Sequence, residues 1–534
     1  MPVETRTAAN GQEMKTYTIT CPYCFKTFSD NQVHFRFRAL AENLQMKSTS
    51  RIRSYDDDEE EEEDDDEEVS GRKSEGDALY LDFWKTFGGQ TSEVAEHGLA
   101  PWNIPVYDPK ADAKMFAAGN NKFIRINGDG MVIGARYKDG KTTSTERVCP
   151  YCHNPLMGSS YGLYPIKFIS VIGVTAAGKT VFLSQLCKIM KESMAQYGLT
   201  AQPTSRYAED YVVANEVAMG KRLPDSTPAE RLLQPICFDI TYTVKNALGA
   251  KEKCVNTIVF YDIAGENCID AVGMSKFGKF IEESDGIILL IPPKQFGIGR
   301  SEEDNLSFRV QPTAVLDCIY NTFYHTKRIQ DVPLAICISQ GDLIAEQILH
   351  GNKLTDISYL DKNGKAIRKF NATDYNPIHE SIMSFLDREQ VALCQQLEDQ
   401  YDNYNYFIVS ALGTNVDEKT HTPDGPTIPL RIMEPFTWLL TKFDFLDADD
   451  FVYQPEDWHC PICGKRQHNS PDSLYCSIHK VNEDGMWKCD YCSTDPSAPV
   501  LYSNKVKWCK KCKRDRFGKK RTIIDLIKDL FSRD

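Results

Sequence analysis

The chain has 534 residues, enough for about three domains, and its 41% hydrophobic content can build a sizeable core. Its net charge of −14 is misleading, because the run Asp56–Glu68 alone holds 13 carboxylates and leaves the rest of the chain nearly neutral. The polar first residues do not resemble a signal peptide, and no apolar run approaches the ~18 residues of a membrane helix. We therefore expect a cytoplasmic protein without a transmembrane segment.

The 18 cysteines are unusual for a cytoplasmic protein and favour metal ligation over disulfides. Ten of them form five C-x-x-C pairs, and Cys476 forms a sixth pair with His479. Two thiolates at this spacing can hold one side of a Zn²⁺ ion, and a second pair completes the tetrahedron. The seven other cysteines lie in apolar runs and are interpreted as core thiols.

The N-terminal region, 16–164, contains two pairs with the same four residues, Cys21-Pro-Tyr-Cys24 and Cys149-Pro-Tyr-Cys152. We predict that they form one zinc ribbon, split by a long insertion. The insertion contains an acidic segment at about 45–76, which is typical of disorder. Alternating residues and Asn-Gly and Asp-Gly turns over 122–141 predict a small antiparallel meander.

Residues Gly173-Val-Thr-Ala-Ala-Gly-Lys-Thr180 follow an apolar strand pattern and precede a helical one. A G-x-x-x-x-G-K-T sequence in this context predicts a P-loop, whose backbone N–H groups hold phosphate oxygens. Lys179 is expected to reach the outer phosphates, and Thr180 to ligate Mg²⁺. The predicted phosphate-binding residues are Gly173, Val174, Thr175, Ala176, Ala177, Gly178, Lys179, Thr180 and Val181.

The next motif is Asp262-Ile-Ala-Gly265, at the end of a predicted strand over 254–261. That strand is expected to form a hairpin with 236–244. An aspartate that closes an apolar strand can hold Mg²⁺, and Gly265 can meet a γ-phosphate through its N–H group. Thr227 is the candidate for a second Mg²⁺ ligand, although a threonine ahead of Pro228 is equally typical of a helix N-cap.

Three further apolar strands, 286–291, 333–338 and 406–410, alternate with helical patterns around 307–328 and 378–402. Alternating strands and helices predict an α/β domain over 165–450, with a mainly parallel, doubly wound sheet. Ligand sites in such folds lie at the carboxyl ends of the strands. Ser339-Gln-Gly-Asp342 and Ser410-Ala-Leu412 lie at those ends.

This order of motifs resembles P-loop GTPases of the translation-factor and Ras-like class. The resemblance implies that Asp342 accepts hydrogen bonds from guanine, and that Ser410, Ala411 and Leu412 meet the guanine oxygen. Gln340 stands where these GTPases have a lysine, and its stem can still cover the base. Glu266 stands where many place a water-orienting glutamine, which makes Lys179 and Glu266 the candidate catalytic residues. A literal Thr441-Lys-Phe-Asp444 match lies on the last predicted helix, after Ser410, and we reject it because of this chain order.

A narrower resemblance rests on the two Cys-Pro-Tyr-Cys pairs, on Ile172–Thr180 and on Asp262–Glu266. A split ribbon immediately before a P-loop strand is similar to the double-GTPase proteins of bacterial conflict systems. These proteins are encoded beside partner GTPases and effectors. The resemblance implies a defence role with a second GTPase or an effector as protein partner.

The C-terminal region, 456–534, contains eight candidate ligands and therefore two further zinc sites, about three in the chain. Sequential ribbons are favoured over a cross-braced arrangement. The expected zinc ligands of the chain are Cys21, Cys24, Cys149 and Cys152; Cys460, Cys463, Cys476 and His479; and Cys489, Cys492, Cys509 and Cys512.

The segment 505–521 carries ten lysines and arginines against one aspartate, with Trp508 and Phe517 among them. This pattern is compatible with nucleic-acid binding, with a solvated face, or with a patch that the acidic run covers. The periodicity of 522–531 predicts a helix that docks on a partner or on the core.

The sequence thus predicts a Mg²⁺-dependent, GTP-binding and hydrolysing switch with structural zinc ribbons. Two alternatives remain: a scaffold that holds a nucleotide without hydrolysing it, and a nucleic-acid-binding NTPase that uses the basic C-terminal zinc module.

Overall fold

The computed structural model divides into two compact units, 1–447 and 448–534. In the first unit it describes residues 4–7, 13–41, 77–88, 100–108, 124–137, 139–174, 176–224, 232–245, 251–269, 271–297, 310–323, 329–360, 363–365, 367–417 and 419–447. In the second unit it describes residues 448, 458–459, 461–462, 466–467, 475–476, 479–482, 484–489, 491–492, 500–503, 505–522 and 525. None of the helices within these ranges combines the length and apolar character needed to cross a membrane.

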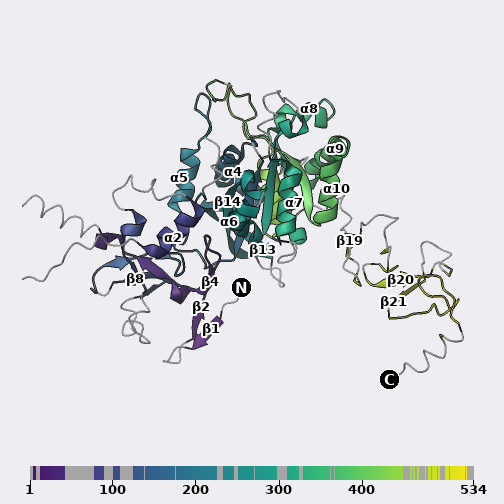
Figure 1. Ribbon diagram of the computed structural model, residues 1–534, viewed down its shortest axis with the longest axis horizontal. Coiled ribbons are helices and arrows are strands. Elements are labelled where there is room, and N and C mark those ends of the chain that lie inside the picture. Colours follow the sequence, from purple (N-terminus) through teal and green to yellow (C-terminus); the bar gives the residue numbers. More distant parts are fainter. Residues whose placement is uncertain are drawn as a thin grey trace, which may run out of the picture. The chain divides into compact units, whose positions relative to one another are not determined.

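A seven-stranded sheet forms the centre of the first unit (Figure 1). Its strands, in spatial order, are β12 (Thr200–Pro203), β13 (Ile236–Lys245), β14 (Lys251–Ala264), β11 (Ile166–Gly173), β15 (Gly286–Ile291), β16 (Leu334–Ile338) and β17 (Tyr404–Ile408). The five strands from β14 to β17 are parallel, whereas β13 runs antiparallel to both β12 and β14. The predicted α/β class with a mainly parallel sheet is confirmed, as is the hairpin of 236–244 with 254–261. The antiparallel edge strand β12 was not predicted.

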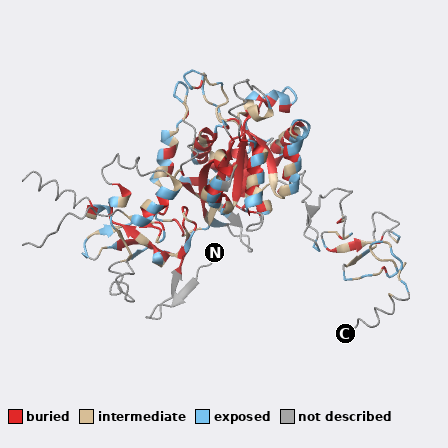
Figure 2. Ribbon diagram, in the orientation of Figure 1, coloured by how far each residue is buried: buried red, intermediate tan, exposed pale blue. Residues whose placement is uncertain are grey.

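Both faces of the sheet are covered, as neighbouring residues of β14 illustrate. Phe260 packs on Phe436 of helix α11 (Met433–Lys442), with ring centroids 5.5 Å apart. Tyr261, the next residue, faces the other way and packs on Phe280 of α6 (Ala271–Glu282) at 5.1 Å. Because side chains alternate along a strand, a strand buried on both faces needs apolar residues at both parities. β15 and β16 accordingly are buried at every position (Figure 2).

The helices of the first unit pack in two groups. In one group, α6 contacts α7 (Pro312–Phe323), α7 contacts α10 (Val391–Gln400), and α10 contacts α9 (Ala372–Glu389) (Figure 1). In the other group, α4 (Lys179–Ser193) contacts both α5 (Arg206–Ala214) and α11. The short helix α8 (Ala345–Ile348) contacts α9. The helices predicted around 307–328 and 378–402 correspond to α7 and to α9 with α10.

The N-terminal part of the first unit consists of small sheets. These are β1 (Glu4–Thr7) with β2 (Glu13–Thr16), β3 (Thr18–Thr20) with β4 (Thr27–Ser29), and β10 (Arg147–Val148), β5 (His34–Arg36) and β6 (Val106–Tyr107) together. The predicted meander is confirmed as β7 (Ile124–Ile126), β8 (Val132–Arg136) and β9 (Thr143–Ser144). Helix α2 (Ala78–Phe87) lies inside the predicted insertion and was not anticipated. The acidic run itself lies outside the described residues.

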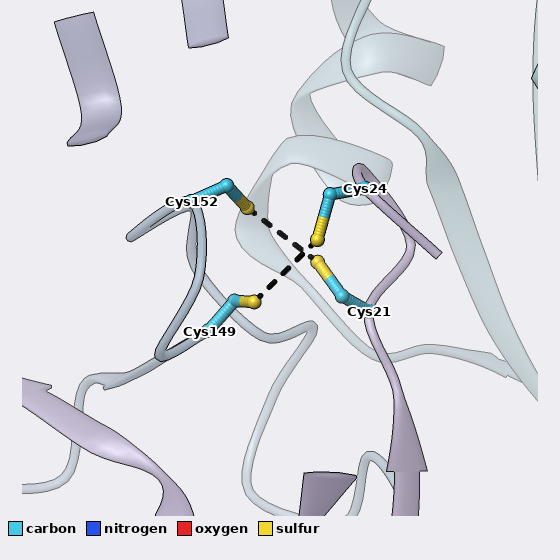
Figure 3. A group of neighbouring side chains, drawn as sticks. All are labelled: Cys21, Cys24, Cys149 and Cys152. Atoms are coloured by element: carbon cyan, nitrogen blue, oxygen red, sulfur yellow. Dashed lines mark hydrogen bonds between the residues drawn. The ribbon is translucent and has the colours of Figure 1, made fainter. Parts of the chain in front are cut away.

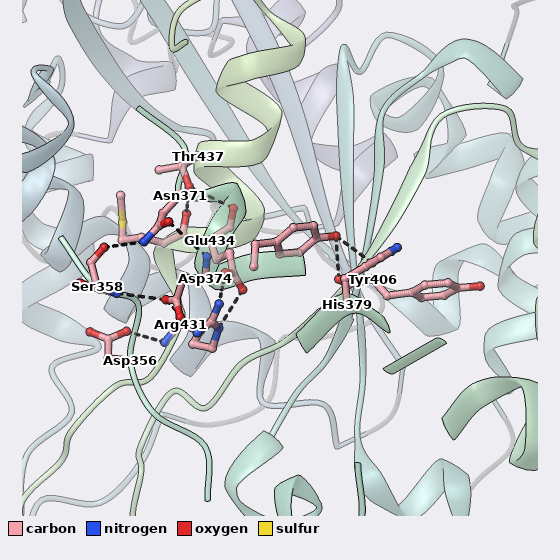
Figure 4. Close-up of polar contacts among 11 residues, drawn as sticks. Asp356, Ser358, Asn371, Asp374, His379, Tyr406, Arg431, Glu434 and Thr437 are labelled. Atoms are coloured by element: carbon pink, nitrogen blue, oxygen red, sulfur yellow. Dashed lines mark hydrogen bonds and ion pairs between the residues drawn. The ribbon is translucent and has the colours of Figure 1, made fainter. Parts of the chain in front are cut away.

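A buried ion pair secures the loop that precedes α11 (Figure 4). The Arg431 guanidinium and the Glu434 carboxylate are almost fully buried and are bonded to each other, with Nε 3.0 Å from Oε2. Asp374 of α9 adds a second carboxylate 3.4 Å from Arg431 Nη1, and Asp356 accepts from the Arg431 backbone N–H at 2.8 Å. Because each buried charge has a partner, the loop is tied to α9 and α11 together.

A buried histidine lies near this pair. His379 Nδ1 is 2.9 Å from the Tyr375 hydroxyl, and its ring stacks on Tyr406 of β17. Burial lowers the pKa of His379 to about 4. The side chain is therefore neutral near pH 7, as its apolar surroundings require.

The second unit contains two small hairpins, β18 (Trp458–His459) with β19 (Arg466–Gln467) and β20 (Met486–Lys488) with β21 (Leu501–Ser503). Trp487 is fully buried and donates its indole N–H to the Val506 carbonyl at 2.8 Å. The hydrophobic core of this unit also contains Cys476, Cys489 and Cys509. The helix predicted over 522–531 lies almost entirely outside the described residues.

Glu434→Ala should lower the free energy of unfolding by about 3–5 kcal/mol, because it leaves the Arg431 charge buried without its main partner. Urea denaturation measures this change. As a matched control, Lys221→Ala breaks the exposed pair with Glu216, 3.2 Å apart, and should cost only about 0–1 kcal/mol. Equal losses for the two variants would contradict the structural role of the buried pair.

Candidate functional site

The glycine loop 173–180, described at every residue except Thr175, joins β11 to α4. Gly178 adopts φ +69 and forms the N-cap of α4, and Ala176 adopts φ +64. Gly173 closes β11, where a Cβ atom would come within 3.1 Å of Lys179 Cβ. The loop therefore curls back over its own helix N-terminus. Such termini present backbone N–H groups and a partial positive charge to anions.

Lys179 and Asp262 meet beside this loop. The strands β11 and β14 are paired in parallel, with Gly173 opposite Ala264, so the loop and the end of β14 lie at one edge. Lys179 Nζ is 2.9 Å from Asp262 Oδ1, and both side chains are almost fully buried. A buried cation and carboxylate at a strand edge can serve a phosphate and a divalent cation respectively.

Gly265 and Glu266 continue from β14 into a 3₁₀ turn, Gly265–Cys268. A Cβ atom at position 265 would lie 2.5 Å from the Gly173 carbonyl oxygen. The close approach of the two backbones thus requires glycine at this position. Glu266, half-buried, begins the segment that leads to α6.

The loops after β16 and β17 are tied to the glycine loop and its helix by two glutamines. Gln340 Nε2 donates to the Ala176 carbonyl at 3.0 Å, and Gln185 Nε2 of α4 donates to the Ala411 carbonyl at 3.2 Å. Gln340 has φ +50 and begins the 3₁₀ turn Gly341–Leu343, which carries the half-buried Asp342.

Ser410 is fixed on the other side of this junction. It exchanges two backbone hydrogen bonds with Leu430, of 3.0 and 2.8 Å, and its hydroxyl accepts from the Gly413 N–H at 2.9 Å. The Gly341 N–H donates to the Val409 carbonyl at 2.8 Å, which joins the two loops directly. The structure thus gathers the predicted residues of three separate loops at the carboxyl edge of the sheet. Of the predicted nucleotide-site residues, Thr175 and Thr227 lie outside the described part of the chain.

The N-terminal cysteine pairs lie together, although they are far apart in the sequence (Figure 3). The sulfur atoms of Cys21, Cys24, Cys149 and Cys152 all lie within 4.8 Å of one another. Cys21 and Cys152 are 3.7 Å apart, as are Cys24 and Cys149. Four thiolates about 2.3 Å from a Zn²⁺ form a tetrahedron with an edge of about 3.8 Å, so this group can hold zinc.

Four of the six ligand pairs, those whose following residue is described, share one backbone geometry. The residue four positions after the first ligand has positive φ and donates its N–H to that ligand's carbonyl oxygen. This holds for Phe25 (φ 55, 3.0 Å), His153 (φ 51, 3.0 Å), Lys480 (φ 53, 2.7 Å) and Lys513 (φ 58, 3.0 Å). Such tight turns aim both ligands toward one point and release N–H groups toward sulfur, as from Tyr23 to Cys21 at 3.4 Å.

In the second unit, Cys489, Cys492, Cys509 and Cys512 form another group within 4.8 Å that can hold zinc. This is the pairing expected of sequential ribbons. Cys476 Sγ and His479 Nδ1 are 3.8 Å apart in a turn of the same form, but their expected partners, Cys460 and Cys463, lie outside the described residues.

The cysteines interpreted as core thiols are buried or half-buried and belong to neither cluster. Burial raises the pKa of Cys268 to about 12 and raises the pKa values of Cys187, Cys237 and Cys337 as well. This agrees with a packing role.

Sequence reasoning missed the residues that surround the N-terminal cysteines. Trp84 of α2 donates its indole N–H to Asn154 Oδ1 at 2.8 Å, and His153 Nδ1 is 2.7 Å from Asp77 Oδ1. Gln185, a polar residue on the buried face of α4, was not predicted either. The available signal for α2 was the aromatic spacing of Tyr80, Phe83, Trp84 and Phe87, which matches one face of a helix.

Comparisons with known proteins give distant similarities. No protein-family model matches the chain. The chain is similar to SaeC of Mycolicibacterium smegmatis, named as an ESX-1 scaffolding and assembly protein, with 23% identity over 336 residues covering 56% of this chain and 80% of that protein. Solved structures similar to it include a variant of Aquifex aeolicus Era bound to GDP and AlF4⁻, with TM-score 0.21, 12% identity, and coverage of 55% of this chain and 60% of that one. A variant of SsGBP has TM-score 0.18 and 14% identity, with 46% of this chain and 49% of that one covered. Both matches cover less than two thirds of the solved chains.

Cys24→Ser should remove one zinc equivalent from the purified chain, because three remaining thiolates hold the ion less tightly. Elemental mass spectrometry, which gives the number of zinc ions per chain, checks this prediction. Cys254→Ser, at a half-buried cysteine outside both clusters, is the control and should leave the zinc content unchanged. The same zinc content in both variants would show that the N-terminal cluster holds no metal.

Proposed function

We propose that this protein binds GTP with Mg²⁺ and hydrolyses it, acting as a molecular switch. The observation that carries the proposal is the meeting of Lys179 and Asp262 beside the glycine loop, 2.9 Å apart at the carboxyl edge of the sheet. A P-loop sequence places the phosphates at this edge, where helix N-termini and inward N–H groups attract them.

In this proposal, different residues bind the phosphates and the Mg²⁺ ion. The backbone of 173–181 cradles the phosphates, and Lys179 neutralises their charge. Thr180 and Asp262 are the proposed ligands of Mg²⁺, with Thr227 as a further candidate. When bound, Mg²⁺ would neutralise negative charge on the phosphates.

The base site is proposed where the loops after β16 and β17 join. Asp342 can accept hydrogen bonds from the guanine edge, and the backbone of Ser410, Ala411 and Leu412 can donate to its oxygen. The Gln340 side chain reaches from this junction to the Ala176 carbonyl and so spans the space between base and phosphate loops. It brings no charge, in contrast to a lysine.

Hydrolysis depends on the segment after β14. The Gly265 N–H can donate a hydrogen bond to the γ-phosphate, so that this segment responds to its presence. Glu266 can orient or deprotonate the attacking water. A carboxylate near a γ-phosphate also repels it, so we expect slow turnover. A scaffold that holds nucleotide without hydrolysis is the alternative, and the name of the similar protein SaeC, a scaffolding and assembly protein, favours it.

The proposed organisation has a split zinc ribbon at 16–164, a GTPase domain at 165–450 and a double zinc module at 456–534. A second GTPase or an effector is the proposed partner, in a bacterial conflict system. The residues that support this context are the two Cys-Pro-Tyr-Cys pairs that flank the insertion before β11.

Lys179→Ala should weaken Mg²⁺–GTP binding about 10- to 100-fold, because it removes a charge-assisted hydrogen bond to phosphate. Titration calorimetry measures the affinity, and denaturation checks that the variant is folded. Lys167→Ala is the matched control: Lys167 lies on β11 and pairs with Asp285 at 2.9 Å, outside the glycine loop. An unchanged affinity in folded Lys179→Ala would refute the phosphate site.

A second candidate function, nucleic-acid binding, is favoured by the surface around the last cysteine pair. Tyr491 and Phe517 are about three-fifths exposed, at 59% and 61%. The Arg514 guanidinium lies 4.1 Å over the Tyr491 ring, Arg516 lies 5.4 Å over Phe517, and Lys507 lies 5.5 Å over Trp508. Exposed rings beside cations can stack bases while the cations meet phosphates.

Charge reversal at Lys510, Lys511 and Lys513 should weaken binding of single-stranded RNA or DNA and flatten its salt dependence, because fewer counterions are released. Fluorescence anisotropy at several salt concentrations measures both quantities. Reversal of three exposed lysines of the first unit, Lys253, Lys279 and Lys353, changes the net charge equally and should have little effect. If both triple variants bind like the unmodified chain, this surface does not bind nucleic acid.

A further inference from the structure

The first N-terminal cysteine turn is bonded to the strand that carries Asp262. The Tyr261 hydroxyl donates to the Pro22 carbonyl at 2.7 Å, and this bond is buried. Pro22 lies between Cys21 and Cys24, and Tyr261 directly precedes Asp262. Because a buried hydroxyl needs a partner, this bond fixes how the turn sits on β14.

Phe25 fastens the same turn to both the strand and the helix beyond it. Its ring lies edge-on to Phe168 of β11, Tyr261 of β14 and Phe280 of α6, with centroids 5.5, 5.8 and 5.1 Å away. Phe25 directly follows Cys24 and has φ 55, a conformation that costs a phenylalanine energy unless its surroundings hold it. The turn that points Cys24 at the metal site thus also points Phe25 into the core.

Helix α2 makes a second connection between the metal site and the nucleotide segments. In the second half of the helix, Phe83 and Trp84 pack edge-on to Tyr23, and Trp84 is bonded to Asn154 beside Cys152. At its C-terminal end, the Phe87 ring contacts Phe277 and Phe280 of α6, at 6.2 and 5.6 Å.

The Phe87 carbonyl also accepts from the Leu232 N–H at 3.2 Å, five residues after Thr227. The turn Cys21–Phe25 therefore contacts the flanks of one segment that is proposed to hold Mg²⁺, and α2, which packs on that turn, contacts the flank of another. One flank is Tyr261 and α6, on either side of Asp262–Glu266, and the other is Leu232.

We propose that metal bound at Cys21, Cys24, Cys149 and Cys152 positions Asp262 and α6, and so sets the Mg²⁺-dependent affinity of the chain for nucleotide. Tyr261 and Phe25 act as positioning residues in this coupling. A Zn²⁺ ion bonded to all four thiolates would hold the two turns, 125 residues apart at Cys24 and Cys149, as one rigid body. Loss of the ion lets the first turn move, and Tyr261 and Phe25 transmit that movement to β14 and α6. This inference rests on the proposed function.

The test compares two tyrosines that hold the same N-terminal region by the same kind of bond. Tyr261→Phe removes the hydroxyl that bonds to Pro22. Tyr161→Phe is the matched control. The buried Tyr161 hydroxyl donates to the Thr20 carbonyl at 2.9 Å, but Tyr161, unlike Tyr261, is not on the strand that carries Asp262. The affinity of a fluorescent GTP analogue is measured for each variant across a Mg²⁺ titration, together with the free energy of unfolding.

Tyr261→Phe should require more Mg²⁺ and bind the analogue about fivefold or more weakly, which is the usual lower range of coupling between sites. Tyr161→Phe should bind like the unmodified chain, although it loses similar stability. Equal affinities in the two variants would overturn the proposal. Should Tyr261→Phe fail to fold, Phe25→Leu and Phe28→Leu form a second pair, because Phe28 packs on Tyr151 instead of β14. Only Phe25→Leu should then alter the Mg²⁺ dependence.

Removal of zinc by a zinc-selective chelator, with the released metal counted by a dye, completes the experiment. Mg²⁺-dependent affinity should fall as the first zinc cluster empties, and Cys24→Ser should show the same fall before any chelator is added. An affinity that is unaffected by zinc loss would contradict the coupling. If the unmodified, zinc-loaded chain binds no nucleotide at all, the proposed function fails, whereas normal binding with no difference between paired variants refutes only this inference.

Discussion

The parallel pairing of β11 with β14 is the constraint on which the site depends. It sets Ile172 opposite Ile263 and Gly173 opposite Ala264, so that the glycine loop and Asp262 leave the sheet at the same edge. The contact between Lys179 and Asp262 follows from this register. A slip of one residue would turn Asp262 toward the other face of the sheet, and so away from the loop. The contacts of Phe260 with Phe436 and of Tyr261 with Phe280 and Pro22 resist such a slip, because a slip would move each side chain to the opposite face.

The cysteine turns of the first unit pack against the sheet and its helices instead of forming a separate core. Tyr23 and Phe25 belong to the same hydrophobic core as Phe168, Tyr261 and Phe280. The backbone turn that orients a cysteine ligand also orients the aromatic residue beside it. Metal chemistry and core packing at the N-terminus are therefore two consequences of one local conformation. In the second unit the same turn recurs at Cys476 and Cys509, with basic residues in place of the aromatic ones.

Much of the fold could be predicted from the sequence because its signals are local. The strand–loop–helix pattern around 173–180, the apolar runs of β15 and β16 and the C-x-x-C spacing each depend on a few adjacent residues. The contacts that tie distant segments together could not be predicted. Gln340 and Gln185 are ordinary polar residues until folding brings them to Ala176 and Ala411. Helix α2 was missed because it is short and lies beyond a long acidic run, where composition favours disorder. Thr227, Cys460 and Cys463 stay predictions, since they lie outside the described residues.

We propose that the edge formed by the glycine loop, Asp262 and the loops after β16 and β17 binds guanine nucleotide. The most direct measurement is the equilibrium affinity of the purified chain for GTP and for ATP in the presence of Mg²⁺, repeated with Asp342→Asn. We expect tighter binding of GTP than of ATP, by about tenfold or more, because the half-buried Asp342 carboxylate can accept from two donors of the guanine base. Asp342→Asn should lose that preference. Tight ATP binding with weak GTP binding, or a GTP preference that survives Asp342→Asn, would refute the guanine site.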